Sequence, residues 1–344
     1  MIETRTIFQY NANATVADVA HLLRQARRVL VTTHAKPDGD AMGSALALAR
    51  ALQHLDKTAD IFLMGPVEAA LRQIAEQTPY ALVENRGPDD EYDLVAIVDT
   101  GSWTQLEPLA DWLRARRPRI LCIDHHTQGD DVAAHRLVQT TRASTTQLLM
   151  EVMDELGIPL DGARGGVAEA LFVGLATDTG WFKFPNADAN AFAVAARLLA
   201  CGVDKSRLYQ TIEETAEPSR LALEARALLS VRFVKGGEVA VMTLGPDDFL
   251  STGGAVEELT GLVNQPMQVR SVRVSILLAE AQRGLTKISF RSKAALDDAP
   301  MMNVNELARQ FGGGGHPNAA GAKVRLGVEE AARAVVDAVE RLRD

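Results

Sequence analysis

Short and almost continuously apolar runs recur along the first half of the chain, at residues 28–33, 59–64, 94–98, 119–123 and 171–176. Stretches with helical periodicity separate most of these runs. A strand that is apolar on both sides needs cover on both faces of its sheet, which is typical of parallel sheets flanked by helices. Strands that alternate with helices build doubly wound α/β domains. The runs therefore predict an α/β domain around a mostly parallel sheet.

The rest of the chain has a different pattern, which predicts a second and smaller α/β domain. Residues 231–244 are typical of a hairpin that turns at two glycines, residues 270–280 and 285–291 of further strands, and residues 328–343 of a closing helix. At 344 residues the chain also exceeds what one hydrophobic core usually supports. We predict a first domain over residues 1–202, a charged helical connector over 203–229 and a second domain over 230–344.

Most of the apolar runs end in residues that bind metal ions or protons. These residues are His34, Asp38 and Asp40 after the first run, Asp99 after the third, Asp124, His125 and His126 after the fourth, and Asp178 after the fifth. Open parallel sheets place their functional sites at the carboxyl ends of their strands. All of these side chains are therefore predicted to meet at one edge of the sheet.

The predicted cluster requires positive charge. Several carboxylates in one crevice cannot all stay ionised unless cations lie between them. Oxygen and imidazole ligands suit Mn²⁺, with Mg²⁺, Co²⁺ or Zn²⁺ as further candidates, and two metal ions support in-line displacement at phosphorus. A competing interpretation treats an Asp after a strand as a helix N-cap and an isolated histidine as structural. Polar groups at four of the five run ends favour the metal site.

The formal net charge of −9 is concentrated in the first two-thirds of the chain. Residues 225–344 hold 15 Lys and Arg against 14 Asp and Glu, so the residues before them carry a net charge of −10. Such an acidic segment repels phosphates unless cations intervene. The sequence has two distant cysteines, no apolar run of membrane-spanning length and no signal-peptide pattern at its start. We therefore expect a cytoplasmic protein that does not contact membranes.

A run of glycines near the C-terminus is a candidate anion site. Gly312, Gly313, Gly314 and Gly315 let the backbone approach an anion closely, and His316 adds a side-chain donor beside them. Residues 303–311 before the run have a helical pattern. A plain flexible turn is the alternative interpretation of the glycines.

Two further stretches are candidates for substrate contacts. Arg142 and Ser144 could reach a phosphate, although Ser144 could equally cap the helix that follows it. The aromatic residues Trp181, Phe182 and Phe184 follow Asp178 closely and could stack on a base. Packing in the core is the favoured interpretation of these aromatic residues.

The motifs resemble those of a known enzyme family. HAKPDGD at 34–40, DTG at 99–101, DHH at 124–126 and DTG at 178–180 are similar to the successive motifs of the DHH phosphoesterase superfamily. GGGGHPNAAG at 312–321 is similar to the signature of its DHHA1 domain. The chain is most similar to the stand-alone nanoRNase and pAp-phosphatase group, the bifunctional oligoribonucleases and PAP phosphatases. The resemblance covers roughly residues 28–325.

The resemblance implies a role for each motif residue. It implies two sets of metal ligands: His34 and Asp38 for one ion, Asp40 and His125 for the other, with Asp99 and Asp178 bridging or completing both. Asp124 would orient the imidazole of His125 and fix its tautomer, while His126 would face the scissile phosphate. Arg291 and Ser292, with the glycine run and His316, resemble the family's nucleotide contacts. A solvated surface position is the alternative for Arg291.

The resemblance also implies an activity. It implies two divalent ions, Mn²⁺ foremost, and a cleft between two domains in which very short RNA or DNA is cleaved to nucleoside 5′-monophosphates. Cleavage of pAp to AMP and a homodimer are further implications. The alternatives are a phosphodiesterase for cyclic or linear dinucleotides, a manganese pyrophosphatase or exopolyphosphatase, and a nucleotide sensor without catalysis. The glycine run argues against the pyrophosphatases with a DHHA2 domain, which lack it, and the complete ligand set argues against a sensor.

Overall fold

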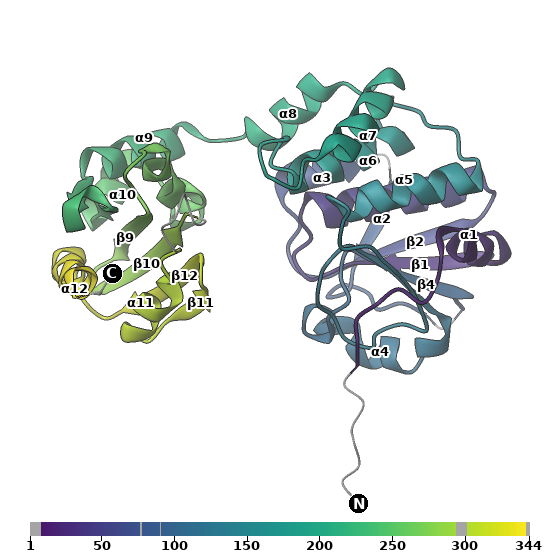
Figure 1. Cartoon of the computed structure of the whole chain (residues 1–344), viewed down its shortest axis with the longest axis horizontal. Coiled ribbons are helices and arrows are strands. Elements are labelled where there is room, and N and C mark those ends of the chain that lie inside the picture. Colours follow the sequence, from purple (N-terminus) through teal and green to yellow (C-terminus); the bar gives the residue numbers. More distant parts are fainter. Residues whose placement is uncertain (1–7, 76–77, 90, 294–300, 342–344) are drawn as a thin grey trace, which may run out of the picture. The chain divides into compact units, whose positions relative to one another are not determined.

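The computed structural model describes residues 8–75, 78–89, 91–293 and 301–341. The chain forms two compact units, which divide after Thr215. The first unit contains a six-stranded parallel sheet in the order β3-β2-β1-β4-β5-β6 (Figure 1). Its strands are β1 (Arg28–Thr32), β2 (Thr58–Leu63), β3 (Tyr80–Leu82), β4 (Leu94–Val98), β5 (Ile120–Asp124) and β6 (His135–Val138). Four of the five predicted strands and the parallel sheet are therefore confirmed.

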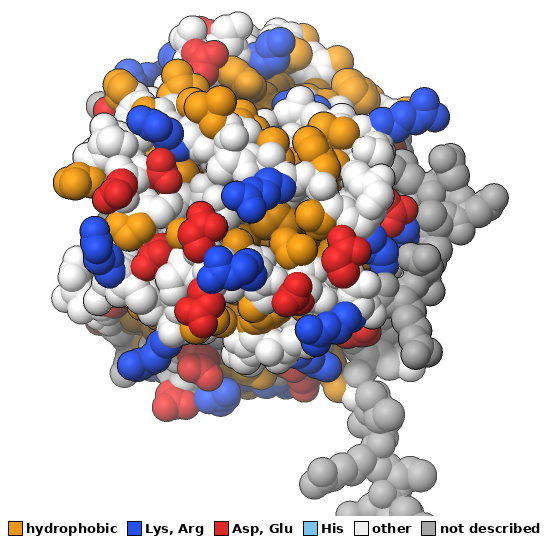
Figure 2. Space-filling model, turned by 90° about the vertical axis from the view of Figure 1, so that its left-hand side faces the viewer, with side chains coloured by type: hydrophobic (Ala, Val, Ile, Leu, Met, Phe, Trp, Pro, Cys, Tyr) orange, Lys and Arg blue, Asp and Glu red, His pale blue; other side chains and the backbone are white. Residues whose placement is uncertain are grey.

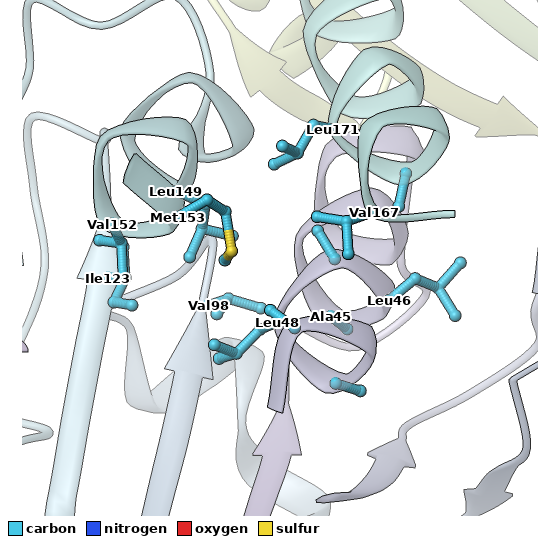
Figure 3. Packing of buried hydrophobic residues seen from close by; sticks show 14 of the residues in the cluster. Ala45, Leu46, Leu48, Val98, Ile123, Leu149, Val152, Met153, Val167 and Leu171 are labelled. Atoms are coloured by element: carbon cyan, nitrogen blue, oxygen red, sulfur yellow. The ribbon is translucent and has the colours of Figure 1, made fainter. Parts of the chain in front are cut away.

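Helices cover both faces of this sheet, as the apolar character of its strands predicts. They are α1 (Val16–Gln25), α2 (Gly39–His54), α3 (Ala69–Ala75), α4 (Ala110–Arg114), α5 (Thr145–Leu156), α6 (Val167–Asp178), α7 (Ala189–Ala200) and α8 (Lys205–Glu213), with 3₁₀ turns η1 (Trp103–Gln105), η2 (Glu107–Leu109) and η3 (Arg117–Arg119). Figure 3 shows Leu149 and Met153 of α5 beside Val98 of β4 in the core on one face. Alternate strand residues, such as Leu30 and Ile97, pack into the core on the other face.

The fifth predicted strand is wrong, because residues 171–176 lie inside α6. Every residue from Val167 to Ala176 is buried, so this helix is apolar on all sides and its sequence gives no helical period. It packs tightly against α2, since a Cβ added to Gly43 would lie 2.5 Å from the carbonyl oxygen of Ala170. Asp178 therefore reaches the predicted site from the end of a helix rather than from a strand.

The second unit contains a mixed six-stranded sheet in the order β11-β12-β10-β9-β8-β7. Its strands are β7 (Arg232–Val234), β8 (Val239–Leu244), β9 (Val274–Gln282), β10 (Leu285–Ser292), β11 (Gly314–His316) and β12 (Ala319–Val324). Its helices are α9 (Pro218–Leu229), α10 (Pro246–Thr252), α11 (Val304–Gln310) and α12 (Val328–Glu340), with 3₁₀ turns η4 (Lys235–Gly237), η5 (Val256–Leu259) and η6 (Leu262–Gln268). The predicted hairpin, both further strands and the closing helix are confirmed.

The two faces of the second sheet are covered unequally. One face packs against α11 and α12 through Ile288 and Phe290 of β10. The other face is covered over β8 and β9, where Met242 and Leu277 pack against α9 and α10. Over β10, β12 and β11 the outward side chains of this second face are half-buried or exposed. The structure thus leaves part of one sheet face accessible in the C-terminal unit.

The segment 203–229, predicted to be a connector, consists mainly of α8 and α9. The division between the compact units falls between these two helices, so α8 belongs to the first unit and α9 to the second. The first unit therefore extends one helix beyond the predicted boundary at residue 202. Among the helices of the described residues, none has the length and apolarity needed to span a bilayer.

Candidate active site

The loop after β1 and the first turn of α2 carry the first site residues. Asp38 is the N-cap of α2, where its Oδ1 accepts hydrogen bonds from the backbone N–H groups of Asp40 and Ala41 at 3.0 Å each. The N-cap interpretation therefore holds for Asp38. The cap does not exclude a second role, because it holds this carboxylate 3.7 Å from the Nε2 of His34. The N-cap interpretation is wrong for Asp99 and Asp178, because Ser102 is the N-cap of the helical turn after β4 and Asp178 is the last residue of α6.

Two buried carboxylates are tied to the N-terminus of α5. Asp40 accepts hydrogen bonds from the backbone N–H groups of Thr145 at 2.6 Å and Thr146 at 3.0 Å, and the Thr145 hydroxyl donates to Asp99 at 2.9 Å. Asp99 follows β4 with a φ of 61°, in the left-handed region that non-glycine residues rarely adopt. Backbone strain of this kind concentrates at functional sites. A helix N-terminus favours negative charge, so α5 stabilises both carboxylates.

Asp124, His125 and His126 lie at the end of β5, and their hydrogen bonds differ from the predicted ones. The Oδ1 of Asp124 accepts from the backbone N–H groups of His125 and His126 and lies 2.7 Å from the Nδ1 of His126. The Nδ1 of His125 lies 3.2 Å from the carbonyl oxygen of Arg142. Asp124 therefore orients the ring of His126, whereas the ring of His125 is oriented by a backbone carbonyl.

The six predicted ligands come together in two sets. Each set brings three ligand atoms within 4.8 Å of one another: His34, Asp38 and Asp99 in the first, and Asp40, His125 and Asp178 in the second. The Nε2 of His34 lies 3.7 Å from Oδ2 of Asp99. The Nε2 of His125 lies 3.6 Å from Oδ1 of Asp99 and 3.7 Å from Asp178. Asp99 therefore faces one histidine of each set with a different oxygen.

Burial dominates the electrostatics of this cluster. It raises the pKa of Asp99 well above its ordinary value, and it raises the pKa of Asp178 to about 6, with the charge of Asp40 adding to both shifts. Burial alone would lower the pKa of His34, but Asp38 and Asp99 outweigh it and raise that pKa to about 10. Without a metal ion, protons therefore offset the repulsion between the acids. A divalent cation would replace those protons.

The hydrogen bonds of His34 and His125 select the tautomers that suit metal ligation. The Nδ1 of His34 faces the carbonyl oxygen of Ala35 at 3.0 Å, as the Nδ1 of His125 faces that of Arg142. A carbonyl only accepts, so each Nδ1 carries a proton, and Nε2 is the atom of each ring that faces the carboxylates. The distances of 3.6–3.9 Å from Nε2 to the carboxylates exceed hydrogen-bond length and leave room for a shared ion. Carboxylate and imidazole together suit Mn²⁺ and related ions.

Sequence reasoning missed Tyr10, whose hydroxyl holds the site residue Asp124 in place. This residue lies in the extended segment before α1, and its hydroxyl donates to Oδ2 of Asp124 at 2.5 Å, across 114 positions of sequence. Its ring fills a slot beside two glycines, because a Cβ added to Gly101 would lie 2.0 Å from its oxygen and one added to Gly129 would lie 2.6 Å from its ring. Both oxygens of Asp124 are thus bonded. No spacing in the sequence indicates this contact.

Removing the Tyr10 hydroxyl should destabilise the first unit. Tyr10→Phe should lower the free energy of unfolding by about 1.5–3 kcal/mol, because Asp124 loses a buried hydrogen bond to a charged group. The control Tyr80→Phe, on the edge strand β3, should change it by less than about 0.5 kcal/mol. Urea denaturation of both variants measures the difference. A Tyr10→Phe protein as stable as the wild type would show that this hydrogen bond contributes nothing.

Arg142 and Ser144 occupy positions with structural partners. The guanidinium of Arg142 pairs with Glu151 at 2.6 Å. Ser144 is the N-cap of α5 and accepts from the backbone N–H of Gln147 at 3.0 Å, so its capping interpretation is confirmed. A contact between Arg142 and phosphate stays a prediction.

The glycine run begins in a turn at Gly312 and ends in the edge strand β11. Gly312 has a φ of 70°, and the chain then enters β11, which pairs with β12 at the edge of the sheet. A Cβ added to Gly313 would lie 2.1 Å from the carbonyl oxygen of Gly321, so a glycine is required where the two strands approach. The turn interpretation therefore holds for Gly312, whereas Gly314 and Gly315 lie in a paired strand. Anion binding by the amide groups of Gly313, Gly314 and Gly315 stays a prediction.

The structure places two predicted substrate contacts in one row of the second sheet. Ala319 of β12 pairs with Arg291 of β10 on one side and with His316 of β11 on the other. Directly paired residues project from the same face, and neighbouring strands lie about 4.8 Å apart. Arg291 and His316 therefore flank a small residue on one face. Ser292 projects from the opposite face, is 9% exposed and donates its hydroxyl to the carbonyl oxygen of Lys293.

Two family models match the chain. The DHH family, N-terminal domain, matches residues 28–175, and the DHHA1 domain matches residues 236–342. The first match includes all predicted ligands except Asp178, which lies three residues beyond it. The second includes the glycine run and His316.

Known proteins match over nearly the whole chain. The bifunctional oligoribonuclease and PAP phosphatase NrnA of Thermus thermophilus is 30% identical over 314 residues, which cover 90% of this chain and 89% of the relative. The protein of the same name in Bacillus subtilis is 26% identical over 315 residues, with coverages of 90% and 93%. The crystal structure of an exopolyphosphatase-related protein from Bacteroides fragilis superposes with a TM-score of 0.81 at 25% identity, covering 97% and 98%. The fold, the ligand motifs and these similarities together show that the chain belongs to the DHH family of phosphoesterases and carries a DHHA1 domain.

Proposed function

We propose that this protein is a metal-dependent hydrolase that cleaves very short oligonucleotides to nucleoside 5′-monophosphates and removes the 3′-phosphate of pAp. The observation that carries the proposal is the position of Asp99, whose two oxygens face His34 at 3.7 Å and His125 at 3.6 Å. A carboxylate shared between two ligand sets is what a pair of neighbouring cations requires. The relatives named oligoribonuclease and PAP phosphatase support the substrate class.

The contribution of this chain is to hold the ligands in fixed positions. The N-cap of α2 holds Asp38, the N-terminus of α5 holds Asp40, and backbone carbonyls hold the rings of His34 and His125. When bound by these residues, Mn²⁺ or a related ion supplies Lewis acidity and activates water for in-line attack on phosphorus. Donors that are held before the substrate arrives do not need to reorganise during the reaction.

His126 is proposed to act on the substrate phosphate. Its Nδ1 is committed to Asp124 at 2.7 Å, so its Nε2 is the atom left to donate. The hydrogen bond that His126 donates to Asp124 raises the pKa of His126 to about 9, which keeps the ring protonated at neutral pH. The side chain is 53% exposed, so a phosphate can reach it. A positive donor at this position would stabilise negative charge on the phosphoryl oxygens in the transition state.

The accessible part of the second sheet is the proposed grip on the nucleotide, and we name it the basic sheet face. Its four basic residues, on β10, β11 and β12, are Lys287, Arg291, His316 and Lys323. The residues between them are small, with Ser289 paired to Gly321 and Gly321 paired to Gly314, so a ligand can approach the strands closely. Sequence reasoning missed both lysines, although alternation along β10 places Lys287 on the same face as Arg291.

The extent of this grip favours short substrates. Long single strands are usually held in an extended basic groove with stacking aromatic residues. Here four basic residues of the basic sheet face provide local charge. On the side of the molecule shown in Figure 2, basic and acidic side chains are interspersed, without a continuous basic stripe among the described residues. Such a surface can hold one or two nucleotides and attracts a longer chain weakly.

Loss of the donor on β11 should weaken catalysis on dinucleotides. His316→Ala should lower kcat/KM on a dinucleotide by about 10-fold to 100-fold, since a hydrogen bond to a charged phosphate is lost. Bound metal should stay unchanged, because no predicted metal ligand lies in the C-terminal unit. The control Arg333→Ala, on α12 at the other face of the sheet, should behave as the wild type. Unimpaired hydrolysis by His316→Ala would remove this residue from the proposed grip.

A substrate panel tests the proposed function itself. Purified protein with Mn²⁺ would be assayed on pAp, on RNA from two to 24 nucleotides, on cyclic dinucleotides and on pyrophosphate. We expect the highest kcat/KM on dinucleotides, a decline towards a dozen nucleotides, and measurable release of phosphate from pAp. Exclusive hydrolysis of pyrophosphate or of cyclic dinucleotides would replace the proposal with one of its competitors.

A further inference from the structure

Aromatic side chains gather beside the metal-ligand sets of the first unit. The chain has ten Phe, four Tyr and three Trp, and five of these residues lie together: Trp181, Phe182, Phe184, Phe192 and Tyr209. Core packing, the favoured interpretation of the stretch, is confirmed for Trp181 and Phe182, which are partly buried against the main core. It is wrong for Phe184, which is 56% exposed, and the neighbouring Tyr209 is 38% exposed.

A left-handed turn presents the first two of these rings. Gly180, Trp181 and Phe182 have φ angles of 56°, 54° and 66°, directly after the ligand Asp178. This conformation is unfavourable for residues with a Cβ and persists only where surrounding contacts impose it. Here the Trp181 N–H donates to the carbonyl oxygen of Ala176 at 2.6 Å, and the Phe182 N–H donates to the hydroxyl of Thr179 at 3.1 Å. The chain therefore accepts local strain to position two aromatic side chains near the ligand.

These rings line a cavity of about 460 Å³, which we name the aromatic cavity. Trp181, Phe182 and Tyr209 are its aromatic lining residues, and the others are Lys183, Lys205, Ser206, Gln210 and Glu214. The indole is held before any ligand binds, because its Nε1 donates to Glu213 at 2.7 Å and its ring meets Tyr209 edge to face at 4.8 Å. Fixed aromatic rings lose little entropy when a planar ligand stacks on them.

The two lysines of the aromatic cavity are unusual for this unit. Residues 1–215 contain four lysines in an acidic sequence, and two of the four line this one cavity. Within the described residues, neither Lys183 nor Lys205 makes an ion pair or a side-chain hydrogen bond. Two ammonium groups without a partner among the described residues, beside partly exposed aromatic rings, match a ligand that combines an aromatic ring with a negative charge.

The aromatic cavity adjoins the metal-ligand sets through the end of α8. A second cavity, of about 310 Å³, is lined by the ligand Asp38, by Thr177 and by Glu213. Glu213 is the residue that accepts the hydrogen bond from Trp181, and the next residue, Glu214, lines the aromatic cavity. The two cavities are therefore linked through Trp181 and the end of α8, which makes the aromatic cavity a candidate place for the nucleotide next to a phosphate held at the ligand sets.

We propose that the aromatic cavity is a nucleotide subsite: it stacks the base of the nucleoside that is joined to the scissile phosphate through its 5′-oxygen, while Lys183 and Lys205 face the phosphates of the same oligonucleotide. The proposal rests on the proposed function, because it assigns a place to the second nucleotide of that substrate. A compound with one base, such as pAp, has no second nucleoside to place there. The subsite therefore distinguishes a dinucleotide from pAp.

The first experiment detects the base directly. A dinucleotide with 5-iodouracil at either position would be bound to the full chain in the presence of chelator, which prevents hydrolysis, and photo-crosslinked. Mass spectrometry should place the crosslink on Trp181 or Tyr209 for one of the two positions. This readout does not depend on catalysis, so a protein that hydrolyses no nucleotide but gives this crosslink would refute the proposed function and keep the subsite.

The second experiment compares conservative and disruptive variants at one exposed position. Tyr209→Leu should raise KM for a dinucleotide by about 10-fold to 100-fold and leave KM for pAp unchanged, since stacking is lost for one base. Tyr209→Phe keeps the ring and should behave as the wild type; Lys205→Gln should raise KM for the dinucleotide, and Lys205→Arg should not. Crosslinks confined to other residues, or equal effects of Tyr209→Leu on both substrates, would overturn the subsite.

Discussion

Asp99→Asn should reduce the rate of dinucleotide hydrolysis by at least about 10³-fold and should also lower the amount of bound metal. Asp99 faces His34 with one oxygen and His125 with the other, so the change removes a carboxylate that lies beside a histidine of each set. The amide of Asn has the same shape but one oxygen, no charge, and an NH₂ group that cannot ligate. Rate measurements and elemental analysis of the purified variant report the two effects separately.

A matched carboxylate controls for the change of charge. Asp111→Asn alters a fully exposed side chain on α4 and should leave rate and metal content as in the wild type. The pKa of Asp99 is raised well above its ordinary value by burial, so removing its charge should not destabilise the fold. A folded Asp99→Asn protein that keeps both its metal and its rate would exclude the shared-ligand geometry.

His126→Ala should reduce the rate by about 10²–10³-fold while bound metal stays at the wild-type level. The reason is that Nδ1 of His126 donates a hydrogen bond to Asp124, which leaves Nε2 free to contact the substrate. Asp124→Asn should give a smaller loss in the same direction, because it removes the acceptor that orients and charges the ring. Metal analysis decides the assignment: if His126→Ala loses metal, then His126 belongs among the ligands, next to Asp99 and His125, whose ligand atoms lie within 4.8 Å of its own.

The fold was predictable where the apolar pattern of the sequence is specific to one kind of buried element. Strands such as β4 are buried on both sides, and their unbroken apolar runs indicated a parallel sheet. The same rule failed for α6, because a helix enclosed on all sides is also apolar throughout and has no period to reveal it. Short edge strands such as β3 and β6 carry too few residues to give a pattern at all.

The residues of the candidate site could be predicted from the sequence, but the hydrogen bonds between them could not. All six predicted ligands come together, because the carboxyl ends of parallel strands share one edge and α6 ends beside them. Spacing could not show that Asp124 accepts a hydrogen bond from the ring of His126 rather than from the ring of His125, since both histidines directly follow this carboxylate in the sequence. It could not show Tyr10 either, because a contact across 114 residues depends on how the N-terminal segment packs.

The central claim is that the two ligand sets bind metal ions that hydrolysis requires. The measurement that tests it most directly is a titration of chelator-stripped protein with Mn²⁺, in which bound metal and the rate of dinucleotide hydrolysis are followed in the same samples. The account predicts no hydrolysis without metal, a rate that rises with occupancy, and saturation near two ions per chain, with Asp99→Asn failing to reach it. Undiminished hydrolysis by the metal-free protein, or saturation that Asp99→Asn leaves unchanged, would contradict it.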